Sequence, residues 1–192
     1  MDDSHDHFLR SHSNALAGFD ALVRSITEEQ WDAPTPDTEW DVSALVDHLV
    51  VEQLWVPPLL AGETVAQVGD RFDRTLVGPA LVAAWDEASK AAAAAFAADG
   101  ALDREVHLSY GDTSALSYGW EMTADLVVHG WDLAQGLGAP YEVDEAVAQE
   151  VWDRLSPMAD MLAASGMFAP PVPVPDDAPV FDRLLGLSGR QP

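Results

Sequence analysis

Two stretches of the chain bring imidazole and carboxylate groups to positions where they could hold a metal ion. In one stretch Asp125 and His129 are four residues apart, so a helix would present both on one face. In the other, His48 lies among apolar residues that should face a core. Two imidazoles and one carboxylate leave a coordination position for water or substrate, which suits catalytic zinc and also non-haem iron. The spacing therefore predicts a metal site without choosing between the two metals.

A metal-free interpretation of the same three residues competes with this one. A carboxylate and an imidazole at this spacing more often form a simple hydrogen bond, and a single core histidine is usually hydrogen-bonded to other protein groups. A buried imidazole or carboxylate needs a partner, either a metal ion or a hydrogen-bonding group, because burying a polar group without one costs on the order of a few kcal/mol of stability. Spacing alone favours the hydrogen bond.

Further candidates lie near these residues in the sequence. Asp132 and Asp47 could orient the histidines as hydrogen-bond acceptors, an arrangement common at metal sites. Glu52 stands one helical turn beyond the first histidine and could be an alternative ligand or a base. Arg71 and Arg74 could hold a carboxylate substrate. Ordinary surface charge is the competing interpretation for each of these five residues.

The composition excludes several classes of function. The chain of 192 residues has no cysteine, so thiolate metal sites, disulfides and a cysteine nucleophile are ruled out. Its 33 acidic and 9 basic residues give a net charge of −24, which would repel a phosphate backbone, so no nucleic-acid partner is expected. No apolar run approaches the roughly 20 residues that cross a bilayer, and the acidic start lacks the features of a secretory signal. We expect a cytoplasmic protein without a membrane partner.

Apolar residues at helical spacing predict five long helices. Ser43 is expected to cap the second helix, and the pair Pro57-Pro58 is expected to end it. His12 falls on the apolar stripe of the first helix, where a hydrogen-bonded core histidine is the expected role. The predicted helices cover residues 4–25, 44–56, 79–98, 116–137 and 144–164.

The remaining segments carry weaker patterns. Residues 62–78 are interpreted as a long connection, and alternation over residues 106–110 allows a short extended piece before a turn at Gly111-Asp112. The proline-rich segment from Phe168 cannot be helical and should be extended, with a last helical turn at residues 181–185. The pattern predicts an all-α fold, a four-helix bundle with an added C-terminal helix and a Pro-rich tail, in a single domain over residues 1–192.

Three stretches of the sequence together carry a resemblance to a known family. They are Trp31-Asp-Ala-Pro-Thr-Pro-Asp-Thr-Glu-Trp-Asp-Val-Ser-Ala-Leu-Val-Asp-His48, Asp125-Leu-Val-Val-His129-Gly-Trp-Asp132-Leu-Ala, and the Pro-rich end through Leu187-Ser-Gly-Arg-Gln-Pro192. In these stretches the chain resembles the actinobacterial branch of the DinB-like superfamily, the group related to the N-terminal, metal-binding domain of mycothiol-dependent maleylpyruvate isomerase. The likeness runs over nearly the whole chain, and the spacing between the histidine and the acid–histidine pair makes it more specific than either motif alone.

The resemblance implies a DinB-like four-helix bundle with a metal at its centre. At the positions that match the family pattern this chain has His48, Asp125 and His129. The implied metal is Zn²⁺, with nickel or iron as alternatives. Relatives activate a low-molecular-weight thiol such as mycothiol for S-transfer or isomerisation, so the implied partners are that thiol and an electrophilic substrate.

The sequence departs from the family pattern at two positions. Asp125 stands where the isomerase-like pattern has glutamate, so coordination would require a small shift of helix or metal, or a bridging water. Asp37 stands where relatives often have cysteine, so any thiol must arrive as a cosubstrate. The isomerase is also expected to have a separate C-terminal domain that this chain lacks.

Three classes of function remain compatible with the sequence. The preferred one is a metal-dependent transferase or isomerase that acts with a thiol cosubstrate. The second is a metal-dependent hydrolase, with Glu52 or Asp132 as general base. The third is a non-catalytic metal- or small-ligand-binding stress-response protein. A homodimer is plausible for a bundle of this size, but no sustained heptad pattern identifies an interface.

Overall fold

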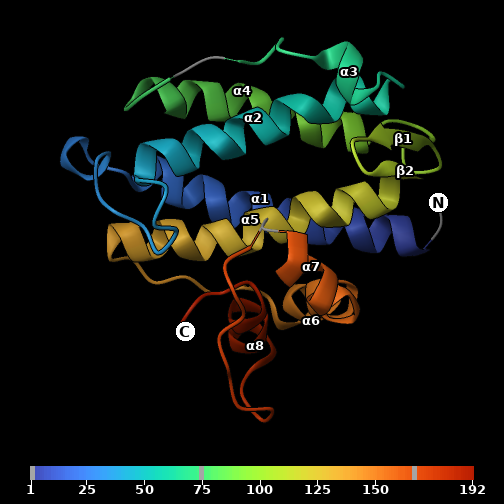
Figure 1. Cartoon of the computed structure of the whole chain (residues 1–192). Coiled ribbons are helices and arrows are strands. Elements are labelled where there is room, and N and C mark those ends of the chain that lie inside the picture. Colours follow the sequence, from blue (N-terminus) through green and yellow to red (C-terminus); the bar gives the residue numbers. More distant parts are fainter. Residues whose placement is uncertain (1–2, 74–75, 166–167) are drawn as a thin grey trace. The chain divides into compact units, whose positions relative to one another are not determined.

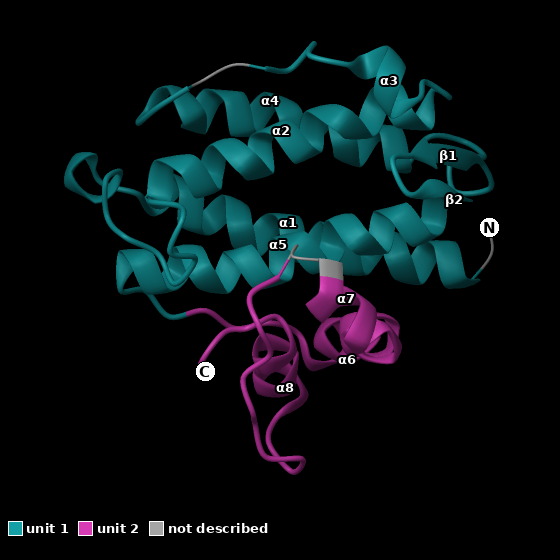
Figure 2. Ribbon diagram, viewed as in Figure 1, with its two compact units in different colours: residues 1–140 teal, residues 141–192 magenta. Residues whose placement is uncertain are grey.

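The chain forms two compact units. The computed structural model describes residues 3–73, 76–165 and 168–192. Unit 1 is Met1–Pro140 and unit 2 is Tyr141–Pro192 (Figure 2). A single domain over residues 1–192 stays a prediction.

Unit 1 is built on four long helices, as the apolar periodicity predicts (Figure 1). α1 packs against α5 and α2 packs against α4, while α2 also contacts α5 and α1 also contacts α4. The prediction of an all-α fold based on a four-helix bundle is confirmed. The helices are α1 (Asp3–Ser25), α2 (Val42–Leu60), α4 (Ala80–Phe96) and α5 (Ala115–Leu137).

The packing of α1 against its neighbours shows how the sequence pattern becomes a core. Phe8 and Phe19, on the apolar stripe of α1, are fully buried. Phe19 meets Trp85 of α4 with 4.7 Å between ring centroids, and Phe8 meets Phe96 at 5.3 Å. Phe8 also lies directly over Gly119 of α5, where a Cβ atom would come within 2.3 Å of the ring. The missing side chain at position 119 therefore lets α1 approach α5 closely.

The predicted start and end of α2 are both wrong. Asp41 is the N-cap, because its carboxylate accepts a hydrogen bond from the Ala44 amide at 2.8 Å, whereas Ser43 lies inside the helix. The helix continues through Pro57-Pro58 to Leu60. Proline has a helical φ, so near a helix end the pair removes two amide donors without breaking the backbone path. Burial of the last turn, where Leu60 is 3% exposed, holds that segment helical.

The connections in unit 1 contain short regular elements. Within residues 62–78, expected to be a plain connection, a capping box between Thr64 and Gln67 supports the short helix α3 (Val65–Val68). The expected extended piece is the first strand of an antiparallel hairpin, β1 (Glu105–Leu108) and β2 (Gly111–Ser114). Gly111-Asp112 was expected to form the turn but belongs to β2, since Gly111 pairs with Leu108. A 3₁₀ turn, η1 (Glu28–Gln30), follows α1.

Unit 2 contains a broken helix where a continuous one is predicted. Residues 144–164 form α6 (Glu145–Leu155), the 3₁₀ turn η2 (Ser156–Met158) and α7 (Ala159–Ser165). Pro157 lies in the 3₁₀ turn and removes an amide donor from the helix interior, which explains the break. The proline-rich segment is non-helical as predicted, and the last helix, α8 (Val180–Leu187), is longer than the predicted turn. α8 packs against α6.

No helix within the described ranges is long and apolar enough to span a membrane.

Replacing Gly119 by alanine tests the close approach of α1 and α5. The added methyl group would overlap the Phe8 ring, so we expect Gly119→Ala to destabilise the protein by about 1–3 kcal/mol, the usual cost of overpacking a core. The measurement is the free energy of unfolding in urea. Gly119→Ala with Phe8→Leu is the matched control and should recover part of the loss, whereas an unchanged stability of the single variant would contradict the packing described.

Candidate metal centre

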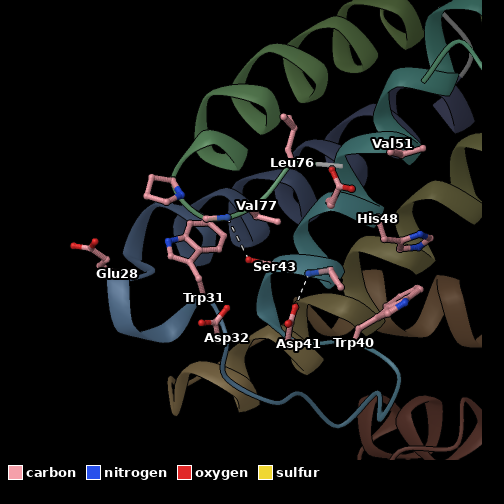
Figure 3. Close-up of a pocket in the computed structure, with 14 residues that line it drawn as sticks. Glu28, Trp31, Asp32, Trp40, Asp41, Ser43, His48, Val51, Leu76 and Val77 are labelled. Carbon is pink, nitrogen blue, oxygen red and sulfur yellow. Dashed lines mark hydrogen bonds between the residues drawn. The ribbon is translucent and has the colours of Figure 1, made fainter. Parts of the chain in front are cut away.

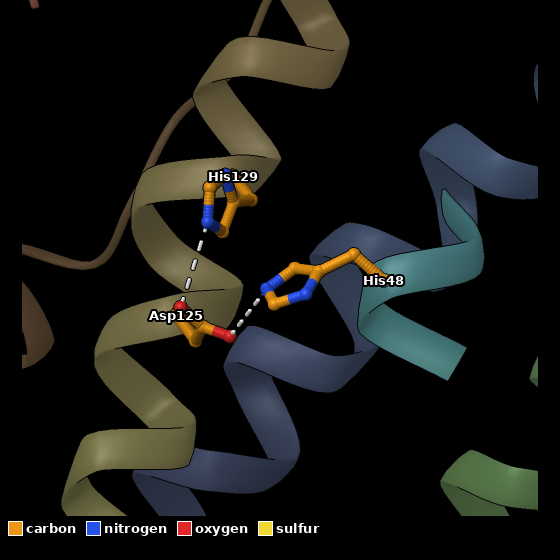
Figure 4. A group of neighbouring side chains, drawn as sticks. All are labelled: His48, Asp125 and His129. Atoms are coloured by element: carbon orange, nitrogen blue, oxygen red, sulfur yellow. Dashed lines mark ion pairs between the residues drawn. The ribbon is translucent and has the colours of Figure 1, made fainter. Parts of the chain in front are cut away.

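His48, Asp125 and His129 meet between α2 and α5 (Figure 4). One ligand atom from each residue lies within 4.8 Å of the other two. Nε2 of His48 is 3.3 Å from Oδ2 of Asp125, and Nε2 of His129 is 3.5 Å from Oδ1 of the same carboxylate. Asp125 therefore faces one imidazole with each of its oxygens, and the three residues predicted from the sequence are together in space.

Helix geometry and an apolar surround position this group. Asp125 and His129 are one turn apart on α5, and neighbouring residues such as Leu126 are fully buried. The side chain of His129 is 8% exposed, whereas those of His48 and Asp125 are each 27% exposed. The centre thus has a buried side at His129 and a side that solvent or a ligand can reach.

Trp40 lies beside both imidazoles. Its ring centroid is 4.5 Å from that of His48 and 5.4 Å from that of His129. The two imidazoles are 5.3 Å apart and nearly perpendicular. An indole in this position restricts the rotation of both rings and gives the accessible side of the centre an aromatic wall.

Asp132 fixes the orientation of His129. It is fully buried, and its Oδ2 is 3.0 Å from Nδ1 of His129. An ionised carboxylate can only accept a hydrogen bond, so Nδ1 donates, and in the tautomer that this bond favours Nε2 keeps its lone pair. That lone pair is on the nitrogen that faces Asp125, so Asp132 lies where its predicted orienting role requires.

The charges around the centre shift the pKa values of two groups. The pKa of Glu52 is raised to about 7, first by burial and then by the nearby Asp125, while His48 and His129 oppose the shift. For His48, burial lowers the pKa, but contact with Asp125 and the charges of Glu52 and Asp37 together raise it above its usual value. Both shifts reflect a partly buried site that is rich in carboxylates.

The other candidates from the sequence lie in different surroundings. Asp47 is half-buried on α2 and lines a cavity next to His48. Arg71 already pairs with a carboxylate, because both of its terminal nitrogens contact Glu63. Arg74 lies outside the described residues. No contact in the described part of the chain connects Arg71 with the centre, so its predicted role with a carboxylate substrate stays a prediction.

Sequence reasoning missed a second group that shares His129. Asp37, His129 and Asp132 also bring ligand atoms within 4.8 Å of one another. Asp37 comes from the proline-containing segment before α2, and periodicity does not predict the path of such a segment. The only signal was its place within the stretch that carries the family resemblance, where it was read as a substituted cysteine.

A cavity of about 650 Å³ opens beside His48 (Figure 3). It lies along the N-terminal half of α2, next to the segments that precede α2 and α4. The lining residues are Glu28, Trp31, Asp32, Trp40, Asp41, Ser43, Ala44, Asp47, His48, Val51, Leu76, Val77, Gly78 and Pro79.

His12 has the structural role predicted for it. The side chain is 2% exposed, and its Nδ1 is 3.0 Å from the Thr123 hydroxyl. Burial lowers the pKa of His12 to about 4, so the ring is neutral in the folded protein at neutral pH.

A DinB-like helical bundle with a His–Asp–His group between two of its helices is the class that this fold and site define. Residues 12–134 match the family model of the mycothiol maleylpyruvate isomerase N-terminal domain, and the chain belongs to this family. The resemblance predicted from the sequence is confirmed.

Solved structures and curated relatives support the same fold. The chain is similar to a crystal structure of the mycothiol-dependent maleylpyruvate isomerase, with a TM-score of 0.73 and 15% identity over 99% of this chain and 92% of that chain. A mutant of that isomerase gives a TM-score of 0.64 and 14% identity over 85% and 72%. Two uncharacterized proteins from two strains of Mycobacterium tuberculosis are each 29% identical over 191 residues, 95% of this chain and 97% of theirs.

The structural match corrects one expectation. A likeness that covers 99% of this chain and 92% of the isomerase chain includes unit 2. The expectation that the isomerase carries a separate C-terminal domain with no counterpart here is therefore wrong. The segment after the bundle, predicted from the sequence as an added helix and a Pro-rich tail, lies within the matched part of the chain.

The neutral, buried His12 makes stability depend on pH. Its pKa is about 4 when folded and about 6.5 when unfolded, so the unfolded state gains a proton first as pH falls. The stability contribution is complete above pH 6.5 and decreases towards pH 4, with about 2 kcal/mol lost by pH 5. The measurement is the free energy of unfolding at pH 7 and at pH 5.

His12→Gln isolates this contribution because it removes the titrating group. The variant should lose about 2 kcal/mol less than the wild type between the two pH values. His7→Gln, at another histidine of α1, is the control. An equal pH dependence of wild type and His12→Gln would contradict a neutral buried ring.

Proposed function

We propose that His48, Asp125 and His129 bind one divalent metal ion, with zinc the expected occupant. We further propose that the centre activates a low-molecular-weight thiol such as mycothiol for S-transfer or isomerisation. The observation that carries the proposal is the convergence of two imidazole nitrogens and a carboxylate within 4.8 Å.

The distances between these atoms support a metal more than hydrogen bonds. Charge-assisted hydrogen bonds between nitrogen and oxygen are about 2.7–2.9 Å long, whereas the two contacts to Asp125 measure 3.3 and 3.5 Å. Ligands bound at about 2.0–2.1 Å around a tetrahedral zinc ion lie about 3.3–3.4 Å from one another. Each of the two contacts is close to that spacing, although they join different oxygens of Asp125, and this supports direct coordination by Asp125.

The chemistry follows from this ligand set. A divalent metal held by three protein groups leaves a position for a thiol, whose pKa it would lower as it lowers that of water. This chain has no cysteine, so the thiol is a cosubstrate. The name of the structural relative points to mycothiol as that cosubstrate.

The chain's own residues have separate tasks in this proposal. Asp132 holds His129 with Nε2 turned to the centre. Trp40 covers the imidazoles on the accessible side and limits the entry of water. Glu52 accepts the thiol proton and returns it to the product, a task suited to a carboxyl group whose pKa burial raises to about 7.

The same property of Glu52 supports a second candidate function. A partly buried carboxyl group with a pKa raised to about 7 can also act as the general base for a water nucleophile. The centre would then be hydrolytic and need no thiol. Turnover of ester or amide substrates without added thiol would favour this alternative.

Metal analysis tests the centre directly. We expect about one equivalent of divalent metal in purified protein and almost none in His129→Ala, because that variant removes the most buried ligand. The measurement is elemental analysis by mass spectrometry after gel filtration. His5→Ala, at a histidine of α1 that belongs to none of the metal-compatible groups of the described residues, is the control and should keep the metal; equal metal in all three proteins, or none in the wild type, would overturn the proposal.

Asp132→Asn tests whether Asp132 orients the ligand. The amide keeps the shape of the side chain but loses the charge, so zinc affinity should fall about 10–100-fold, the usual effect of removing such a partner. Competition with a chromophoric chelator measures this affinity. Asp103→Asn, at an exposed aspartate, is the control, and an unchanged affinity in Asp132→Asn would exclude the orienting role.

Thiol binding tests the enzymatic part of the proposal. Zinc-loaded protein should bind mycothiol saturably in calorimetry, and the zinc-depleted protein should not. Absence of saturable binding to the loaded protein would refute thiol activation without affecting the metal centre.

A further inference from the structure

The cavity beside His48 is lined by carboxylates and indole rings. Its acidic members are Glu28, Asp32, Asp41 and Asp47, and its described lining residues include no lysine or arginine. Trp31 and Trp40 supply two aromatic walls (Figure 3). A volume of about 650 Å³ is within the usual range of small-molecule sites.

The four carboxylates differ in how much of their negative charge is available to a ligand. The Asp41 carboxylate already caps the N-terminus of α2, where it accepts a hydrogen bond from the Ala44 amide. The helix N-terminus therefore balances part of the negative charge of Asp41. Asp32 comes from the segment after η1, and Asp47 comes from α2 one residue before His48. Acidic groups therefore reach the cavity from more than one element.

The cavity adjoins the proposed metal centre. His48 belongs to both, since it lines the cavity and faces Asp125. Trp40 also belongs to both, with its ring 4.5 Å from the His48 ring. A molecule bound in the cavity would thus lie beside the His48 imidazole. This is where a second substrate would have to lie in order to react with a thiol bound at the proposed metal centre.

The charge of the lining residues determines which molecules can bind in the cavity. A carboxylate ligand would meet several like charges and, among the lining residues that the structure describes, no basic group with which to pair. An ammonium group would be attracted to the same carboxylates and could also lie over an indole face, a favourable contact for cations. The apolar part of such a ligand could pack against Val51 and Leu76, which line the cavity.

We propose that this cavity selects the electrophilic substrate by charge and takes a small molecule with a cationic amino group and an apolar body. The inference rests on the proposed function, because it treats the cavity as the second substrate site of the His48 centre. Maleylpyruvate, in the name of the structural relative, is a dicarboxylate, and a substrate of that kind would be repelled here. The two proteins would then share a fold and differ in substrate charge.

Three matched probes test charge selection. Phenethylamine, phenethyl alcohol and phenylpropanoate share an aromatic ring and a short chain and differ in the charge of the end group. Calorimetry on metal-depleted protein at low ionic strength should show phenethylamine binding at least about tenfold more tightly than the other two, a difference of about 1.4 kcal/mol. Zinc is left out because amine and carboxylate probes could both bind it.

Variants separate the cavity from the general acidity of the protein. Asp32→Asn and Asp47→Asn should each weaken phenethylamine binding severalfold and leave phenethyl alcohol unchanged. Asp99→Asn removes one exposed charge away from the cavity lining and should have little effect. Thermal unfolding checks that each variant is folded.

The outcomes are distinct from those of the metal and thiol experiments. Equal or tighter binding of phenylpropanoate, equal effects of all three variants, or no saturable binding of any probe would each overturn charge selection. None of these results depends on bound metal or on mycothiol. The substrate proposal can therefore fail while the metal centre stands, and the reverse is also true.

Discussion

The position of Asp125 between two imidazoles from different helices is the constraint on which the rest of the site depends. Its two oxygens face His48 of α2 and His129 of α5, so the centre exists only while these helices keep their distance and register. Asp132 then sets the His129 ring, and Trp40 limits both rings from the accessible side. The orientation of the proposed ligands therefore depends on helix packing, and the proposed chemistry depends on that orientation.

The absence of cysteine and the many carboxylates near the centre are both compatible with the proposed chemistry. In the proposed function the thiol comes from solution, because the chain has no cysteine, and two imidazoles with one carboxylate would leave a metal position for it. The surrounding acids, including Glu52 and Asp37, favour retention of a cation. The same acids make the neighbourhood unfavourable for anionic molecules, which connects the electrostatics of the centre with those of the cavity.

Much of the fold could be predicted because helical periodicity is a strong local signal. The bounds of α1 and α5 agree with the sequence to within a residue or two, and that agreement brought Asp125 and His129 onto one face. The ends of α2 could not be predicted, since burial of Leu60 kept the Pro57-Pro58 turn helical. The approach of Asp37 to His129 depends on the path of an irregular segment, which local preferences do not determine.

The contact between Gly119 and Phe8 has a consequence for how this family can diversify. Gly119 and the ligand pair are on the same continuous helix, so a shift of α5 at its N-terminal end would carry Asp125 and His129 together while His48 stays with α2. Loss of the centre therefore does not require a change in any ligand. A related sequence could keep all three proposed ligands and still lose the proposed centre through one added methyl group more than a helical turn away, and a motif search would continue to match it.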